Sequence, residues 1–266
     1  MNAIQNALSV LKARTVQGKF NAANDLAKTW DTFQNIGSPI DNPPHNPGRP
    51  AKPKLVPPSD VPRRRLGSEA GRGALLHAVA HIEFNAIDLA ADMIVRFGHH
   101  PDIPVSKRAG FVADWISVCH DEARHFMMLE TRLQDFDMNY GCLPAHNGLW
   151  EAAVRTKDNF AARLAIAPMV LEARGLDVTP GMIEKLNKIG DLESSKILKT
   201  IYNDEINHVA IGAKWFLDMA ESQKKTPETY FHALIKEYYS GQLKPPFNVQ
   251  ARTLAGLKQG FYMPIT

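Results

Sequence analysis

The sequence is poor in the features that define several other classes of protein. Only two of its 266 residues are cysteines, Cys119 and Cys142, so a disulfide framework is excluded and a reducing compartment, the cytoplasm, is the expected location. No run of about 18 apolar residues occurs, which argues against a membrane-spanning helix. Polar residues interrupt residues 1–20, which therefore lack the apolar core of a secretory signal.

An excess of one charge and the patterns of β-strands are also missing. The net charge is +3 and the pI is about 8.8, which is too weakly basic to indicate nucleic-acid binding by itself. Alternation of apolar and polar residues is absent, and clusters of β-branched residues are rare. Hydrophobic residues make up 44% of the chain, enough for a packed core, so an all-α protein is expected.

Apolar residues recur at helical spacing in most of the chain and predict the order of its helices. Gly175 is expected to end one of them, with Thr179 capping the next and Pro180 in its first turn. The expected helices span residues 3–13, 20–34, 68–97, 104–137, 148–174, 179–189, 191–222 and 226–239.

Residues 37–62 contain nine prolines and two glycines and interrupt this helical pattern. Proline lacks the N–H donor of a helix and biases the residue before it to extended geometry, so an extended strap is expected. The sequence leaves open whether the strap is free or packed on the helices. It ends in Arg63, Arg64 and Arg65, whose simplest interpretation is a solvated charged run, with a phosphate or RNA contact as the alternative.

These segments predict four regions with different roles in the fold. The helices of the third region would form a four-helix bundle, and the other regions would lie outside it. The regions are an N-terminal helical hairpin (1–36), a Pro-rich strap (37–66), the bundle (67–224), and a C-terminal helix and tail (225–266).

One motif, Asp-Glu-x-x-His, occurs twice, at residues 121–125 and 204–208. Residues three apart share a helix face, so each copy aims a carboxylate and an imidazole in one direction. A lone glutamate in an apolar helical pattern precedes each copy. Two such helices and two single-glutamate helices supply the ligands of a carboxylate-bridged two-metal site in a four-helix bundle. The six candidate ligands are Glu83, Glu122, His125, Glu172, Glu205 and His208.

The chemistry of this set favours a metal site over chance. Taken singly, a helical glutamate is usually solvated, and Glu-x-x-His is common by chance. All four glutamates, however, lie among apolar residues, and charged groups are rarely buried unless they are paired or ligate a metal. Four carboxylates balance the charge of two divalent cations, and without metal they would repel one another. Iron is the first expectation and manganese the alternative.

Neighbouring residues are candidates for supporting roles. Asp121 and Asp204 each precede a motif glutamate and are placed to orient a ligand histidine, and Arg124 to close a charge network around it. The alternative for these three residues is a surface ion pair. Tyr202 and Trp115 precede the motif glutamates on the ligand side of their helices. They are candidates to line a substrate pocket or carry a radical, with core packing as the alternative.

The motif Asp-Glu-Ala-Arg-His at residues 121–125 resembles that of the ferritin-like di-iron carboxylate superfamily. This superfamily includes bacterial multicomponent monooxygenases, ribonucleotide reductase small subunits and a tRNA hydroxylase. The strings LLHAVAHIEFNAIDLA, DEARHF, LPAHNGLWEAA, VLEARGLDVTPGM and DEINHVAIG are also similar to one bacterial ferritin-like family without a settled activity. This second resemblance covers nearly the whole chain and implies a ferritin-like four-helix bundle.

The resemblance also implies how the ligands are divided. The first lone glutamate and the first Glu-x-x-His pair would hold one metal, and the second set would hold the other. Glu122 and Glu205 would be the bridging carboxylates. The second motif has Asn207 where the first has Arg124, which implies an asymmetric charge network.

Three functions are consistent with this pattern. The first is an O₂-dependent di-iron oxygenase or oxidase that acts on an unknown organic substrate, a modified tRNA base being one option, with electrons from an external donor. The second is ferroxidase, peroxidase or catalase-type handling of metal or peroxide. The third is a non-catalytic metal-binding bundle. A homodimer through the N-terminal hairpin or the tail is one expectation, and a membrane partner is not expected.

Overall fold

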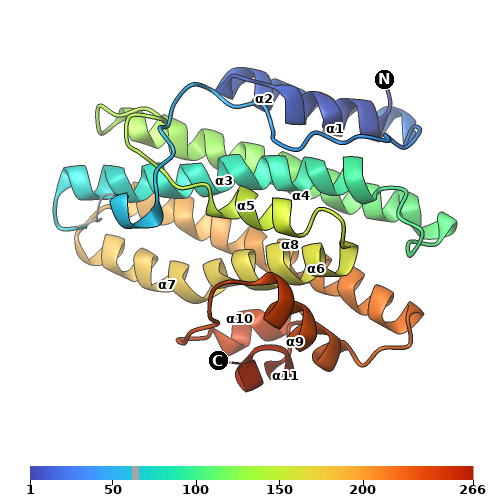
Figure 1. Ribbon diagram of the computed structural model, residues 1–266. Coiled ribbons are helices and arrows are strands. Elements are labelled where there is room, and N and C mark those ends of the chain that lie inside the picture. Colours follow the sequence, from blue (N-terminus) through green and yellow to red (C-terminus); the bar gives the residue numbers. More distant parts are fainter. Residues whose placement is uncertain (62–65, 266) are drawn as a thin grey trace. The chain divides into compact units, whose positions relative to one another are not determined.

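The computed structural model describes residues 1–61 and 66–265. Within these ranges all regular secondary structure is helical, apart from one isolated bridge between Leu55 and Ala145, and the all-α prediction is confirmed. None of the helices in this part of the chain has both the length and the apolarity needed to cross a bilayer. The run Arg63–Arg65 lies outside the described residues. The chain forms two compact units, Met1–Trp150 and Glu151–Thr266 (Figure 1).

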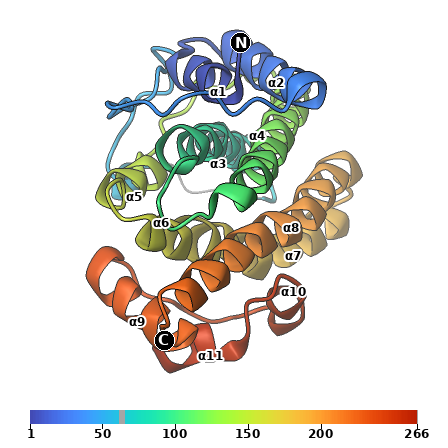
Figure 2. The same cartoon turned by 90° about the vertical axis from the view of Figure 1, so that its right-hand side faces the viewer.

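The first unit consists of two helical hairpins. Helices α1 (Ala3–Lys12) and α2 (Val16–Phe33) form the first, and α3 (Glu69–Phe97) and α4 (Val105–Gln134) form the second. Helix α1 packs on α3 and α2 packs on α4, so one hairpin covers the other (Figures 1 and 2). The short connection between α3 and α4 makes them antiparallel neighbours, which lets side chains near the middle of both helices meet.

Helix α3 is the central helix of this unit and is buried around most of its circumference, as expected for a helix surrounded by protein. It begins where the sequence predicts, because the Ser68 hydroxyl accepts a hydrogen bond from the Gly71 N–H at 3.1 Å. Asp88 in α3 forms a buried ion pair with Lys19 of α2, whose ammonium also donates to the Val10 carbonyl. This pair joins the two hairpins.

The Pro-rich strap is packed on the first unit. The Gly48 N–H donates to the Leu11 carbonyl at 2.6 Å. Carbonyls of the strap also accept from side chains: Pro44 from Arg96 at 3.0 Å, and His45 from the Trp150 indole N–H at 3.1 Å. Because proline has no N–H, a segment so rich in it is held largely through its carbonyls.

The second unit is built around a hairpin of α7 (Ala173–Lys188) and α8 (Leu192–Ser222). Helix α8 begins at the predicted position, capped by Asp191, whose carboxylate accepts from the Ser194 N–H at 3.1 Å. Helix α5 (Gly148–Arg155) runs across the boundary between the two units. The remaining elements are α6 (Phe160–Ile166), the π-helical segment η2 (Ala167–Glu172), α9 (Pro227–Tyr238), α10 (Val249–Leu254), α11 (Gln259–Tyr262) and the 3₁₀ turn η3 (Met263–Ile265).

The sequence-based prediction of one helix over residues 148–174 is wrong. The helix stops after Arg155, and α6 starts only after Asn159, whose side chain accepts from the Ala162 N–H at 2.9 Å. The chain then widens into η2 before α7 begins. The polar residues 155–159 mark the break. The widening into η2 leaves no comparable signal, because a π-helical segment changes the hydrogen bonding and not the side-chain composition.

Two predicted helix boundaries are also wrong, because α7 continues through Gly175 and Pro180. Pro180 cannot donate to the carbonyl of Leu176, four residues earlier. That carbonyl instead accepts from the Asn248 side-chain amide at 3.2 Å. The C-terminal segment therefore supplies the hydrogen bond that the proline removes, and the helix is not broken.

Candidate metal centre

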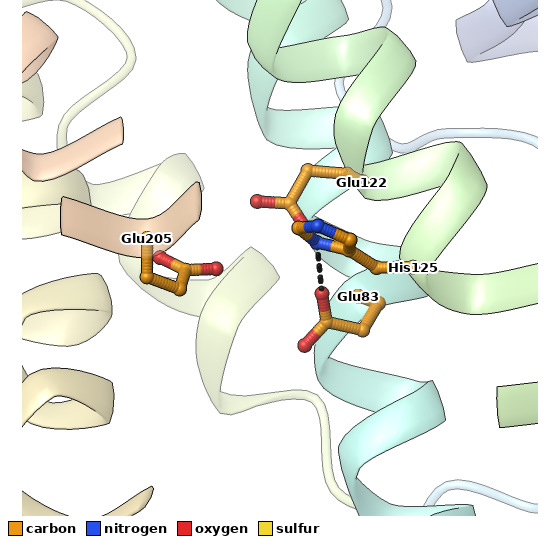
Figure 3. A group of neighbouring side chains, drawn as sticks. All are labelled: Glu83, Glu122, His125 and Glu205. Atoms are coloured by element: carbon orange, nitrogen blue, oxygen red, sulfur yellow. Dashed lines mark hydrogen bonds and ion pairs between the residues drawn. The ribbon is translucent and has the colours of Figure 1, made fainter. Parts of the chain in front are cut away.

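Helices α3 and α4 bring three of the candidate ligands together in the first unit. Glu83 lies near the middle of α3, and Glu122 and His125 lie one turn apart on α4. Their ligand atoms lie within 4.8 Å of one another. The His125 Nδ1 atom is 3.2 Å from the Glu83 Oε2 and 3.6 Å from the Glu122 Oε2. Figure 3 shows the Glu83 carboxylate facing the His125 ring, with the side chain of Glu122 above it.

This cluster is fully inside the protein. Glu122 and His125 are 0% exposed and Glu83 is 3% exposed. Burial, followed by the charge of Glu122, raises the pKa of Glu83 well above its usual range. Burial alone would lower the pKa of His125, but the hydrogen bonds and charges of the two carboxylates outweigh it and raise the pKa. The cluster of Glu83, Glu122 and His125 thus retains a proton, because the buried carboxylates favour a positive charge beside them.

A divalent cation fits this donor set. Carboxylate oxygen and imidazole nitrogen are ligands that iron, manganese and zinc accept, and a bound cation replaces the proton that the three groups otherwise share. Charged side chains are rarely buried without such compensation. The cluster of Glu83, Glu122 and His125 can therefore hold a metal ion.

The residues next to the ligands in sequence include buried aromatic rings, and the neighbouring Cys119 is a protonated thiol. The rings of Phe84 and Phe126, which follow Glu83 and His125 in the sequence, pack with centroids 5.2 Å apart. Cys119, one turn before Glu122, is buried, and its burial raises the pKa of the thiol far above the ordinary value. It stays protonated, with its S–H directed at the Ile87 carbonyl at 3.7 Å. Softer sulfur ligation is thereby disfavoured.

The second unit places the other three candidate ligands on two elements that pack together. Glu205 and His208 lie one turn apart on α8, with the His208 Nδ1 3.7 Å from the Glu205 Oε1, and both are buried. Glu172 is half-buried and is the last residue of η2, which packs on α8. The side chain of Glu205 is also drawn in Figure 3. Each unit thus carries one copy of the ligand pattern.

The position of η2 depends on a close contact with α8. Pro168 of η2 lies against Gly212 of α8, where a Cβ atom on residue 212 would be 2.3 Å from the Pro168 Cβ and Cγ. Only glycine permits this approach. Gly212 lies one turn beyond His208 on α8. The contact with Pro168 therefore fixes η2 next to the part of α8 that carries the second motif.

The residues predicted to support the ligands have varied environments. Asp121 and Arg124 form an ion pair at 3.1 Å, with side chains 26% and 41% exposed. Asp204 is half-buried on α8. Trp115 is 2% exposed in the core of the first unit, 6.3 Å from Phe111 between ring centroids. The Tyr202 hydroxyl accepts from the Asn248 amide at 2.9 Å, which ties it to the C-terminal segment. Their functional roles stay predictions.

The structure also identifies residues that the sequence did not indicate. Arg49 of the strap and Tyr140 of the loop after α4 come together with His81 of α3 around a pocket. Arg49 and Tyr140 lie in irregular segments, where no helical or strand period connects a side chain to its neighbours. Local proline content was the only signal from this part of the chain, and it predicts backbone shape, not contacts.

Fold and site together define an all-α protein with a buried carboxylate–histidine cluster that can hold a metal ion. Residues 12–263 match the family described as "Protein of unknown function (DUF455)", and the chain belongs to that family. An "Uncharacterized protein" of Haemophilus influenzae is 40% identical over 210 residues, which cover 79% of this chain and 73% of the relative. No solved structure matches the chain. The ferritin-like relationship suggested by the motifs stays a prediction.

Proposed function

We propose that the protein is a di-iron carboxylate oxidase or oxygenase of ferritin-like architecture, with manganese as the alternative metal. The observation that carries the proposal is the buried cluster of Glu83, Glu122 and His125, whose ligand atoms lie within 4.8 Å of one another. Two carboxylates and an imidazole in an apolar interior suit a redox-active divalent metal. A purely structural role would not require three ionisable groups at one buried point.

A second metal ion is part of the proposal. Glu172, Glu205 and His208 repeat in the second unit the ligand set of the first, with one lone glutamate and one Glu-x-x-His pair. We propose that the two sets together form one carboxylate-bridged centre, in which Glu122 and Glu205 are the bridging ligands. Four carboxylates would neutralise two divalent cations, so the complete centre could be buried without excess charge.

The protein's own residues would have limited but definite tasks. Iron bound at this centre would supply the one-electron redox chemistry needed to activate O₂. The helices α3 and α4 hold their ligands rigidly, because both run without interruption through the site. The burial of Glu83, Glu122 and His125 would keep water away from the metal, which strengthens electrostatic interactions and limits side reactions. An external electron donor is part of the proposal.

The substrate is proposed only as an oxidisable organic molecule. A modified tRNA base is the option suggested by the resemblance to the tRNA hydroxylase. Fold alone does not determine a substrate, so this option rests on analogy.

The test is metal analysis of anaerobically purified protein, followed by O₂ uptake of the Fe(II)-loaded form. We expect two irons per chain. Mössbauer spectroscopy should show magnetic coupling between them, because a bridging ligand couples the two metals. His125→Ala should weaken iron binding by more than about 100-fold, since even the loss of an outer partner of a metal ligand costs about 10- to 100-fold.

The matched control is His120→Ala, which removes a half-buried histidine from the same helix and should leave iron content unchanged. Two uncoupled irons would contradict the bridged centre but not the individual sites. Rapid breakdown of hydrogen peroxide by a dimanganese form, without O₂ uptake, would contradict the oxygenase assignment and favour a catalase. Failure of the intact protein to bind any metal would refute the proposal as a whole.

A further inference from the structure

A pocket of about 390 Å³ lies in the first unit, and none of the candidate ligands lines it. Strap residues 49–55 form one wall, and His81, Phe84 and Tyr140 form the other. Pockets of about 300 to 1,000 Å³ are typical of small-molecule sites. The volume therefore suits a compact organic ligand and not a macromolecule.

The strap wall of this pocket is held in place by backbone contacts. The Val56 N–H donates to the Ala145 carbonyl at 2.8 Å, and the Ala145 N–H donates to the Lys54 carbonyl at 3.1 Å. Gly141 has a φ of +96°, and a Cβ atom there would lie 2.8 Å from the Lys52 Cβ. The loop can approach the strap this closely only with glycine at that position. The pocket is thus preformed, which lowers the entropic cost of binding a ligand.

The charge of the lining is of one sign. Its three charged residues are Arg49, Lys52 and Lys54, and no carboxylate lines the pocket. Arg49 is half-buried, and its guanidinium donates to the neutral amide oxygen of Asn85 at 2.8 Å. Within residues 1–61 and 66–265, no carboxylate forms an ion pair with it. The buried Asp88 carboxylate is ion-paired with Lys19 and acts on Arg49 through its charge alone. A partly buried guanidinium whose hydrogen bond goes to a neutral amide is well suited to bind an anionic ligand.

The opposite wall is aromatic. The Tyr140 ring lies 5.1 Å from the Phe84 ring and stacks on His81 at 6.0 Å between centroids, with planes inclined by 22°. The Tyr140 hydroxyl and the His81 Nδ1 are 2.8 Å apart, and the His81 Nε2 lies 3.0 Å from the His146 carbonyl. These polar atoms therefore pair with one another within the wall. What remains for a ligand is mainly ring carbon, which favours a planar apolar body.

We propose that this pocket binds a small aromatic or similarly planar organic anion, with its carboxylate or phosphate on the Arg49 guanidinium and its apolar body against Phe84 and Tyr140. Lys52 and Lys54 are both exposed and add positive charge at the rim. The inference does not depend on the proposed metal centre, because no candidate ligand lines the pocket and all of its residues belong to the first unit.

The test is calorimetric titration of the full chain with four probes. Benzoate and phenyl phosphate carry the proposed anion on an aromatic ring and should bind, and comparing them identifies which anion the site prefers. Benzamide has the ring without the charge, and inorganic phosphate has the charge without the ring. Both should bind at least about tenfold more weakly than the better aromatic anion, because each lacks one half of the recognition.

Variants then locate the site. Arg49→Gln should weaken binding of the better anion by at least about tenfold, the loss expected for a charge-assisted hydrogen bond. Lys52→Gln should weaken it about two- to threefold, as expected for an exposed charge, and it cannot disturb the core because its side chain is exposed. Arg155→Gln is the matched control, since Arg155 is an exposed arginine of the second unit and its loss should leave binding unchanged.

Three results would overturn the proposal. Equal binding of benzamide and benzoate would show that charge is not recognised. Binding that is equally weakened in Arg155→Gln and Lys52→Gln would indicate a general surface effect. No binding of either aromatic anion at millimolar concentration would show that the pocket is not an anion site. None of these outcomes involves the iron content, so they are separate from a failure of the metal proposal.

Discussion

The two hairpins that carry the Glu-x-x-His pairs are built differently. In the first unit, α3 and α4 are uninterrupted helices of 29 and 30 residues, and Glu83 lies inside a regular helix. In the second unit, Glu172 is the last residue of the π-helical segment η2, and the next helix contains Pro180. The same ligand pattern is thus presented by a regular backbone in one unit and by an irregular one in the other.

This difference shows what each copy of the site depends on. The regular hairpin needs only the packing of its helices, and the buried ion pair of Asp88 with Lys19 joins it to α2. The irregular hairpin needs specific support: Gly212 admits η2, and Asn248 repairs the hydrogen bond lost at Pro180. Less favourable backbone geometries persist where their surroundings stabilise them, and they occur frequently at functional sites.

The largest effect is expected for Lys19→Met, which breaks the ion pair of the regular hairpin. An unpaired carboxylate is left fully buried, so the free energy of unfolding should fall by roughly 3–5 kcal/mol. The double variant Lys19→Met with Asp88→Leu removes both charges and should recover most of that loss. Chemical denaturation of the three proteins measures both effects, and a double variant as unstable as the single one would contradict the account.

The same variant has a predictable pH dependence. Burial raises the pKa of Asp88 to about 6, in spite of Lys19. This value lies above the value of about 3.9 in an unfolded chain, so ionisation of Asp88 lowers stability as the pH rises from about 4 to 6, by roughly 3 kcal/mol. The cost of Lys19→Met should accordingly be large at about pH 7.5 and small at about pH 4.5, where Asp88 is protonated.

A smaller effect is expected for Gly212→Ala, which tests the irregular hairpin. The added Cβ would lie 2.3 Å from Pro168, and relieving this overlap should cost roughly 1–3 kcal/mol. Because η2 must move, the proposed site of Glu172, Glu205 and His208 should lose metal affinity while the first cluster retains it. Metal titration would show one tight equivalent in place of two.

The matched control is Gly110→Ala in α4, where a Cβ atom meets nothing within 4 Å. Alanine is the better helix former by roughly 1 kcal/mol, so this variant should be slightly more stable and keep both metals. Equal losses of stability in the two glycine variants would show that the contact with Pro168 is unimportant.

The smallest effect is expected for Asn248→Ala, which removes the donor to the Leu176 carbonyl. The loss should include roughly 1 kcal/mol for this hydrogen bond. In a Pro180→Ala background the new N–H at residue 180 can bond to the same carbonyl, so Asn248→Ala should then cost less. Other contacts of Asn248, such as that with Tyr202, are lost in both backgrounds and cancel in the cycle. Equal costs would contradict the proposed repair.

Much of the fold could be predicted from periodicity and capping. Ser68 and Asp191 mark the starts of α3 and α8, because their side chains satisfy N–H groups that any helix leaves open. The two Glu-x-x-His pairs could be predicted for the same reason, since a three-residue spacing on one helix needs no tertiary information. The resemblance implies that Glu83 and the first pair hold one metal, and in the structure the His125 Nδ1 lies 3.2 Å from the Glu83 Oε2.

The errors lie where a distant part of the chain changes a local preference. Pro180 signals a helix boundary by itself, and it lies inside α7 only because Asn248 replaces the missing donor. The π-helical segment likewise depends on Gly212, which is distant in sequence from Pro168. A single sequence indicates neither contact, because side-chain hydrogen bonds and close packing across about 40 to 70 residues leave no periodic signal.

By itself, the sequence determined the helical class, the strap, and two ligand patterns, because each follows from backbone chemistry within a few residues. Only the tertiary structure decided that the strap packs on the first unit and that Glu172 ends a π-helical segment. The same holds for the cationic pocket beside Tyr140. These features depend on which surfaces come together when the chain buries its apolar residues, and that outcome is a property of the whole fold, not of any segment.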